Sequence, residues 1–378
     1  MRQVLVSVFF LGLMTAAPLV AGEDKPPAPR PPPVVSPEIK ADHSVIFRIK
    51  AAQAKEVAVR GQWAKDPLAL TRDDNGVWSG TAAAIPAGVW EYSLVVDGVS
   101  MIDPGNGAIK PMREPRTSIL QLPGSPALPW DFQDVPHGTV HSHVYASKTF
   151  GVPREVVVYT PPGYEHSTAT YPLLVLQHGS GDNQQTWVAH GKANYIFDNL
   201  IAAGKAQPMV VLMLFGHQPA GTPQDADPAK RRAVAMAAFR DELLQDALPL
   251  LDATYRVDKG PERRAIAGLS MGGGQSLGVG LANLDRFGWI GAFSAAPPDL
   301  DLVQATLDDA AGTNAKLKLL WIACGKDDFL RERNEAFIAT LKAKGIQHEW
   351  VQSEGGHAWP VWRQYLLDFV PKLFVAKP

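Results

Sequence analysis

Apolar residues are spaced in two different patterns along this chain of 378 residues. Between residues 38 and 122, short runs such as Gly88–Val96 alternate apolar and polar positions, and tight-turn sequences such as Asp74-Asn75-Gly76 separate them. No stretch of this region has a convincing helical period. The pattern predicts a small all-β, immunoglobulin-like sandwich over residues 38–122.

After a linker over residues 123–136, nearly continuous apolar runs alternate with amphipathic helices. Such runs are typical of strands buried on both faces of a sheet, and they lie at Val156–Thr160, Leu173–Leu176, Met209–Phe215, Ala265–Leu269 and Leu317–Ala323. The expected helices are Trp187–Ala203, Ala235–Thr254, Gly272–Leu284, Arg331–Ala343 and Pro360–Phe369. The alternation predicts an α/β domain with a mostly parallel sheet over residues 137–378.

The N-terminus has the pattern of a secretory signal. A basic start is followed by an apolar run over residues 4–13 and by small residues before Glu23. We expect a signal peptide at residues 1–22 and export to the periplasm or medium, with a membrane anchor as the alternative. Residues 23–37 are rich in proline and predict an extended linker without packed structure.

The amino-acid composition limits the kinds of partner and metal site that this protein can have. Thirty-six basic and 38 acidic residues give a net charge of −2, which supplies no overall field for a polyanion and argues against nucleic acid as a partner. The single cysteine, Cys324, excludes an internal disulfide and an all-cysteine metal site. We therefore expect a globular protein without a disulfide framework.

The segment around Ser270 carries the strongest chemical signal. An apolar strand runs into Gly268-Leu269-Ser270-Met271-Gly272, and small residues then open a helix. In this pattern the serine lies on a sharp strand-to-helix turn, with its hydroxyl exposed at the carboxyl edge of the sheet. We expect Ser270 to be a nucleophile, and a helix start capped by a serine is the alternative.

A serine nucleophile needs a base, and the base needs an acid that orients it. In this type of domain the acid and then the histidine follow the serine along the chain. His357 lies in a loop before the last helix, whereas His348 begins a strand, so His357 is the expected base. Asp327 and Asp328 both follow a buried strand, and their position leaves the choice between them open.

Two backbone amides are expected to stabilise the oxyanion. The Met271 amide lies at the start of the helix after the nucleophile. The Ser180 amide lies in a glycine-rich turn after an early strand, next to His178, which is expected to support this turn. The candidate substrate-binding residues are Trp187, Trp359 and Gln275.

Residues from about 140 to 378 resemble carbohydrate esterase family 1, a group of α/β-hydrolases that includes feruloyl and acetylxylan esterases. The segments that carry the resemblance are Gln177–Gly179, Phe239–Leu244, Arg264–Gly273, Cys324–Phe329 and Gly355–Arg363. The resemblance implies an α/β-hydrolase sandwich, and its Gly-x-x-Asp pattern selects Asp328 as the acid. Ala358 is a departure, because relatives often carry an acidic or polar residue there. Residues 38–122 resemble the early-set sandwich related to carbohydrate-binding family 48, on looser motifs at residues 96–98 and 102–106.

The resemblance implies an exported serine esterase that removes feruloyl or acetyl groups from xylan-type polysaccharide or oligosaccharide, without a metal or organic cofactor. The alternatives are an esterase for a siderophore trilactone of the enterochelin type, or for another small ester or thioester, and a carbohydrate-binding protein with an inactive esterase domain. The expected partner is the ester-decorated carbohydrate, with no membrane contact after signal cleavage, and the oligomeric state stays open.

Overall fold

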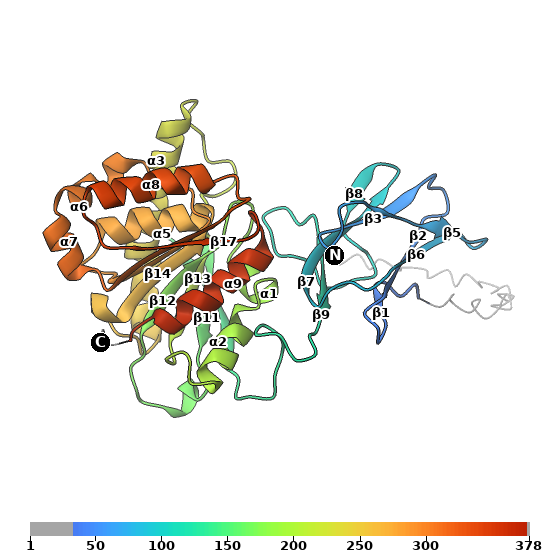
Figure 1. Ribbon diagram of the computed structural model, residues 1–378, viewed down its shortest axis with the longest axis horizontal. Helices are drawn as coiled ribbons and strands as arrows, with labels where there is room; N and C mark the ends of the chain where they lie inside the picture. Colours follow the sequence, from blue (N-terminus) through green and yellow to red (C-terminus); the bar gives the residue numbers. More distant parts are fainter. Residues whose placement is uncertain (1–32, 376–378) are drawn as a thin grey trace, which may run out of the picture. The chain divides into compact units, whose positions relative to one another are not determined.

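The computed structural model describes residues 33–375 (Figure 1). The expected signal peptide at residues 1–22 and residues 23–32 of the expected linker lie outside the described residues. Packed structure begins earlier than expected, because Ser36 is buried and its hydroxyl donates a hydrogen bond of 2.7 Å to Asp103 Oδ2. No helix within residues 33–375 is long and apolar enough to cross a bilayer.

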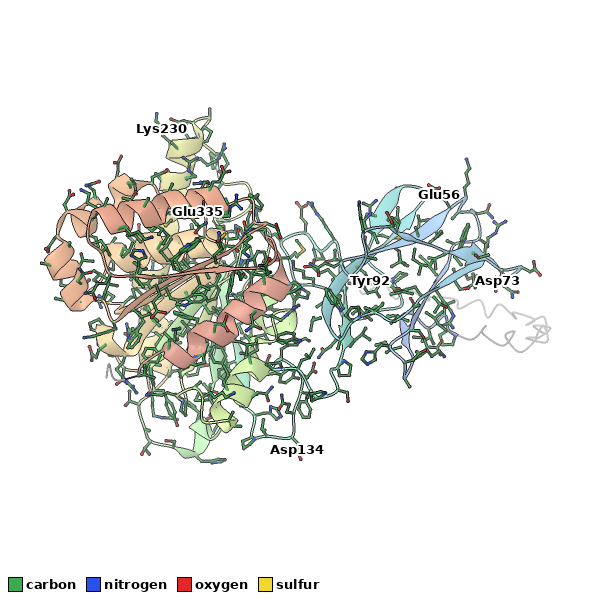
Figure 2. All side chains as sticks on the ribbon, in the orientation of Figure 1. Glu56, Asp73, Tyr92, Asp134, Lys230 and Glu335 are labelled. Carbon is green, nitrogen blue, oxygen red and sulfur yellow. The ribbon has the colours of Figure 1, made fainter. Side chains whose placement is uncertain are left out.

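Residues 38–122 form two antiparallel sheets, and this part of the chain contains no helix. One sheet has the order β1-β2-β6-β5, and the other has the order β4-β3-β7-β8 with β9 paired to β7. Phe47 and Tyr92 are buried in a separate hydrophobic core, whose buried residues all lie between Val45 and Leu122. Figure 2 labels Tyr92 among these strands. The immunoglobulin-like arrangement stays a prediction. The strands are β1 (Glu38–Ile39), β2 (Val45–Lys50), β3 (Val57–Gly61), β4 (Leu68–Ala69), β5 (Thr71–Arg72), β6 (Val77–Ala82), β7 (Gly88–Val96), β8 (Val99–Met101) and β9 (Ser118–Leu122).

From residue 139 onward the chain forms an eight-stranded sheet with the order β10-β11-β13-β12-β14-β15-β16-β17. Strands β13, β12 and β14 to β17 are parallel, and β10 and β11 extend the edge as antiparallel strands. The expected mostly parallel sheet is therefore confirmed. The strands are β10 (Thr139–Ala146), β11 (Pro153–Thr160), β12 (Leu173–Gln177), β13 (Val210–Leu214), β14 (Arg264–Leu269), β15 (Trp289–Phe293), β16 (Leu319–Gly325) and β17 (Glu349–Ser353).

Helices cover both faces of this sheet (Figure 1). Phe239, Leu277 and Phe337 belong to the apolar layer on one face, and Trp187 and Tyr365 belong to the layer on the other. The first face carries α3 (Pro228–Asp241), a π-helix (Glu242–Ala247), α4 (Leu248–Thr254), α5 (Met271–Ala282), α6 (Gln304–Asp308), α7 (Ala310–Lys316) and α8 (Arg331–Ala343). The second face carries α1 (Thr186–Ala189), α2 (Ala193–Ala202) and α9 (Trp359–Phe369).

The structure differs from the sequence predictions at three places. The helix expected over residues 187–203 is broken at Gly191, where an added Cβ would lie 2.6 Å from the Trp187 carbonyl oxygen. The helix expected from Ala235 begins at Pro228 and contains the π-helical turn. Strand β15 and the short helices α6 and α7 were not predicted.

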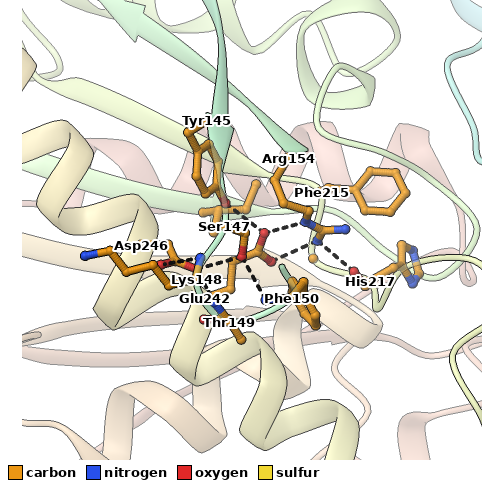
Figure 3. Close-up of polar contacts among 12 residues, drawn as sticks. Tyr145, Ser147, Lys148, Thr149, Phe150, Arg154, Phe215, His217, Glu242 and Asp246 are labelled. Atoms are coloured by element: carbon orange, nitrogen blue, oxygen red, sulfur yellow. Dashed lines mark hydrogen bonds and ion pairs between the residues drawn. The ribbon is translucent and has the colours of Figure 1, made fainter. Parts of the chain in front are cut away.

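A buried polar cluster joins β11 to the π-helix (Figure 3). Arg154 donates from Nε and Nη2 to the two carboxylate oxygens of Glu242 at 2.6 and 2.9 Å, and also from Nη2 to the His217 carbonyl oxygen at 2.7 Å. One helical turn on, Asp246 Oδ2 accepts a hydrogen bond of 2.7 Å from Ser147 Oγ. The cluster fixes the segment that follows β13 at the carboxyl edge of the sheet.

Replacing Glu242 with Gln is expected to destabilise the protein strongly. Arg154 would keep its buried charge without a counter-charge, which costs about 3–5 kcal/mol in the free energy of unfolding. The matched control is Glu335→Gln in α8, because Glu335 is exposed and lies 3.7 Å from Arg331 (Figure 2). Its expected effect is below about 1 kcal/mol. Urea denaturation checks both values, and equal losses in the two variants would contradict the account of the buried pair.

Candidate active site

Ser270 lies on a strained turn between β14 and α5. Its backbone has φ 54° and ψ −114°, which is uncommon for a residue with a side chain. Two glycines make the turn possible. A Cβ added to Gly268 would lie 2.6 Å from the backbone of Gly272, and a Cβ added to Gly272 would lie 2.4 Å from the carbonyl oxygen of His178. The Ser270 amide donates a hydrogen bond of 2.8 Å to the Phe293 carbonyl oxygen on β15. The turn holds Ser270 just beyond the carboxyl end of β14.

Two neighbouring loops bring His357 and Asp328 to the serine. His357 lies between β17 and α9, and its Nε2 is 2.9 Å from Ser270 Oγ. Asp328 lies between β16 and α8, and its carboxylate oxygens are 2.9 and 3.0 Å from His357 Nδ1. In this order the imidazole can take the hydroxyl proton while the carboxylate holds the ring in place. The structure thus brings these three residues together.

The two candidate acids occupy different environments. Asp328 is 5% exposed and contacts His357, whereas Asp327 is exposed. Burial pushes the pKa of the Asp328 carboxyl upward, but hydrogen bonds, chiefly with His357, outweigh burial and bring the pKa below its ordinary value. Asp328 is therefore charged near neutral pH and can stabilise an imidazolium. Burial raises the pKa of the Cys324 thiol to about 12, so this side chain is no thiolate nucleophile.

The loop after β12 lies directly against Ser270. A Cβ added to Gly179 would be 3.4 Å from Ser270 Cβ, so the neighbouring Ser180 amide belongs to a segment beside the serine. His178 supports this loop, because its two ring nitrogens each lie 2.8 Å from a carbonyl oxygen, one in the loop and one after β13. Met271 begins α5. Both candidate oxyanion donors therefore border Ser270 in the chain or in space.

The three residues expected to contact a substrate lie inside the protein. Trp187 and Trp359 are 1% and 2% exposed, and their rings pack edge to face at 4.9 Å. Gln275 is 5% exposed, and its Nε2 donates a hydrogen bond of 2.9 Å to the Gly216 carbonyl oxygen. All three side chains are buried, and the Gln275 Oε1 has no hydrogen-bond partner among the described residues. Their substrate-binding role stays a prediction.

An exposed aromatic ring beside the site comes from Phe329, which sequence reasoning alone missed. Its side chain is 74% exposed, and its ring centroid lies 4.4 Å from that of His357. Trp362 also contacts the His357 ring, edge to face at 4.9 Å. The available signal was the position of Phe329 in the sequence, as a large aromatic residue directly after the candidate acid.

Comparison with known proteins finds one matching family model and a related protein that aligns with most of this chain. The family model described as "Putative esterase" matches residues 147–373. The "Endo-1,4-beta-xylanase/feruloyl esterase" of Xylanibacter ruminicola is 30% identical over 353 residues. That match covers 89% of this chain but 46% of the relative, so this chain spans less than half the length of that protein.

Solved structures share the fold. The ferulic acid esterase of Anaeromyces mucronatus, in complex with ferulic acid, superimposes with a TM-score of 0.57 at 23% identity, covering 65% of this chain and 93% of that one. The enterobactin esterase of Shigella flexneri, in the presence of enterobactin, superimposes with a TM-score of 0.61 at 21% identity, covering 88% and 92%. At these identities the likeness shows the fold alone.

The buried histidines predict a loss of stability in acid. Burial lowers the pKa of His190 and His217 to about 3. Below a pH of about 6.5 the unfolded chain binds protons at these rings and the folded chain does not. The stability that each ring contributes therefore rises with pH between about 3 and 6.5, by about 1.4 kcal/mol per pH unit.

Urea denaturation across this pH range checks the prediction in the wild type and in His217→Asn. The unfolding free energy of the variant is expected to rise less steeply with pH, because one protonation step of the unfolded chain is removed. An unchanged slope would show that His217 is not held neutral in the folded protein.

Proposed function

Because the chain belongs to the putative esterase family, we propose that it is an exported serine esterase that removes feruloyl or acetyl groups from xylan-type polysaccharide or oligosaccharide. The observation that carries the proposal is the hydrogen-bonded order Ser270–His357–Asp328 at the carboxyl edge of the sheet. It supports acyl transfer, because a serine hydroxyl becomes a nucleophile when a positioned base removes its proton.

In the proposed mechanism Ser270 Oγ attacks the ester carbonyl carbon while His357 Nε2 accepts the hydroxyl proton. His357 then returns the proton to the departing sugar oxygen as the ester C–O bond breaks. Asp328 accepts the hydrogen bond from His357 Nδ1, and the amides of Ser180 and Met271 donate to the oxyanion of the tetrahedral intermediate. Water then attacks the acyl carbon while His357 accepts its proton. The bond between the acyl carbon and Ser270 Oγ breaks, His357 returns the proton to Oγ, and the carboxylic acid leaves.

The substrate class rests on a relative and on one side chain. The Xylanibacter ruminicola relative named as a xylanase and feruloyl esterase aligns with 89% of this chain. Phe329 presents an open ring 4.4 Å from His357, where it can stack on a phenolic acyl group or on a sugar face. Both observations favour an ester that joins a small acid to a carbohydrate.

A siderophore trilactone of the enterobactin type is the second candidate substrate. The similarity in fold to the Shigella flexneri enterobactin esterase favours it, because that match covers 88% of this chain and thus extends beyond the part that the family model matches. The same three residues would open a lactone by the same acyl-enzyme steps. A non-catalytic carbohydrate-binding role is disfavoured, since binding alone gives no reason for a histidine 2.9 Å from a strained serine.

Product release from matched substrates tests the proposed function. Ferulate and acetate are measured from decorated xylan oligosaccharides, with enterobactin as a third substrate, for the wild type and Ser270→Ala. We expect ferulate or acetate release by the wild type and a loss of about 10⁴-fold or more in the variant. Faster cleavage of enterobactin would favour the trilactone. Full activity in Ser270→Ala would overturn the serine mechanism, and binding of the xylan oligosaccharides without any hydrolysis would favour the non-catalytic role.

The adjacent aspartates form a matched pair for testing the acid. Asp328→Asn removes the acceptor that fixes the His357 ring, so kcat is expected to fall by about 10³- to 10⁴-fold. Asp327→Asn makes the same chemical change at an exposed side chain, and kcat is expected to stay near the wild-type value. Steady-state kinetics on one ester checks both variants. A larger loss of kcat in Asp327→Asn than in Asp328→Asn would show that Asp328 is not the acid.

A further inference from the structure

A buried lysine connects the N-terminal sheets to the loop beside Ser270. Lys110 follows β8, and it is 6% exposed. Its ammonium lies 3.0 Å from Glu91 Oε1 on β7 and 3.1 Å from Asp182 Oδ1. Asp182 ends the turn that begins at Gly179 and contains Ser180. One ammonium thus joins a carboxylate of the β-sandwich to a carboxylate of the candidate oxyanion loop.

The backbone on both sides of this ion pair is paired as well. The Arg113 amide donates a hydrogen bond of 2.9 Å to the Gly181 carbonyl oxygen, and Met112 forms an antiparallel bridge with Asp182. Thr186 Oγ1 donates a hydrogen bond of 2.6 Å to the Pro111 carbonyl oxygen. The segment Lys110–Arg113 therefore acts as an extra strand-like support along the outer side of the turn.

Lys110 also contacts the segment that follows the catalytic histidine. Its ammonium lies 5.7 Å from the ring centroid of Trp359, two residues beyond His357. Trp359 packs edge to face on His190 at 5.3 Å, and His190 Nε2 lies 3.3 Å from Glu91 Oε1. The same ammonium therefore touches the loop that carries Ser180 and the helix start that carries Trp359.

Electrostatics makes Lys110 necessary at this position. Burial raises the pKa of Asp182 to about 6, and Lys110 opposes that rise. Burial keeps His190 neutral by lowering its pKa to about 3, so His190 supplies no positive charge near pH 7. Without Lys110, the buried carboxylate of Asp182 would face the half-buried carboxylate of Glu91 with no lysine charge between them, and one of the two would have to move or take up a proton.

We propose that Lys110 is a positioning residue of the esterase site, which holds the Gly179–Asp182 turn so that the Ser180 amide points at the oxyanion. This inference rests on the proposed function. The N-terminal sandwich then takes part in catalysis through one side chain and a short backbone bridge, without touching the reacting atoms. A displaced amide lowers the rate of acyl transfer and leaves ground-state binding of a small ester nearly unchanged, because the oxyanion forms only in the transition state.

The test compares four full-length proteins: the wild type, Lys110→Met, the double variant Lys110→Met/Asp182→Asn and the control Lys65→Met, at an exposed lysine of the same sandwich. The substrate is p-nitrophenyl acetate, and thermal unfolding is measured in parallel. Lys110→Met is expected to lower kcat by about 10- to 100-fold with KM within about threefold of the wild type. The double variant removes the unpaired Asp182 charge and is expected to recover part of kcat, and Lys65→Met is expected to match the wild type.

Each outcome bears on one claim. A folded Lys110→Met protein with the wild-type kcat, even at a lower melting temperature, would overturn the positioning role and leave Lys110 as packing alone. If Lys110→Met does not fold, the double variant decides: wild-type kcat there overturns the role, and reduced kcat at unchanged KM supports it. A wild-type chain that hydrolyses no ester would instead overturn the proposed function, and the inference would fall with it.

Discussion

The site depends on the close approach of Gly272 to the end of strand β12. A Cβ at this position would lie 2.4 Å from the His178 carbonyl oxygen and 2.6 Å from that of Gln177, so only glycine lets helix α5 start this near the strand. The contact helps to keep Ser270 at its positive φ, and it also fixes the origin of the loop that carries Ser180. One backbone contact therefore helps to position both the candidate nucleophile and the candidate oxyanion donor, which is the kind of preorganisation that acyl transfer needs.

Buried charges hold the segments around that contact. Arg154 and Glu242 fix the chain after β13, and Lys110 and Asp182 fix the turn after β12. Pairs of this kind add little net stability when intact, because desolvation offsets the attraction, but they are costly to break. Their effect is to restrict loop positions at the carboxyl edge of the sheet. The two groups of strands thus share one constraint, since Lys110 comes from the segment over residues 38–122 and Asp182 follows β12 of the eight-stranded sheet.

Local features could be predicted from the sequence and long-range ones could not. Ser270 and His357 follow from a five-residue turn pattern and from chain order, both of which are local or nearly so. Asp328 required a family resemblance, because Asp327 follows the same strand and burial in three dimensions separates the two. Strand β15 was missed because Gly291 lies at its centre and interrupts the apolar run. The ion pair between Lys110 and Asp182 joins residues that are 72 positions apart, and neither composition nor periodicity could predict it.

The central claim is that Ser270 carries the acyl group during turnover, and mass spectrometry of the covalent intermediate tests it most directly. The protein is mixed with a slowly turned-over aryl ester, quenched in acid and digested, and the peptides are mapped. The account predicts one acyl group per chain on the peptide that contains Ser270, absent in Ser270→Ala. Hydrolysis that proceeds with no acylated peptide, or with the acyl group on another residue, would contradict it.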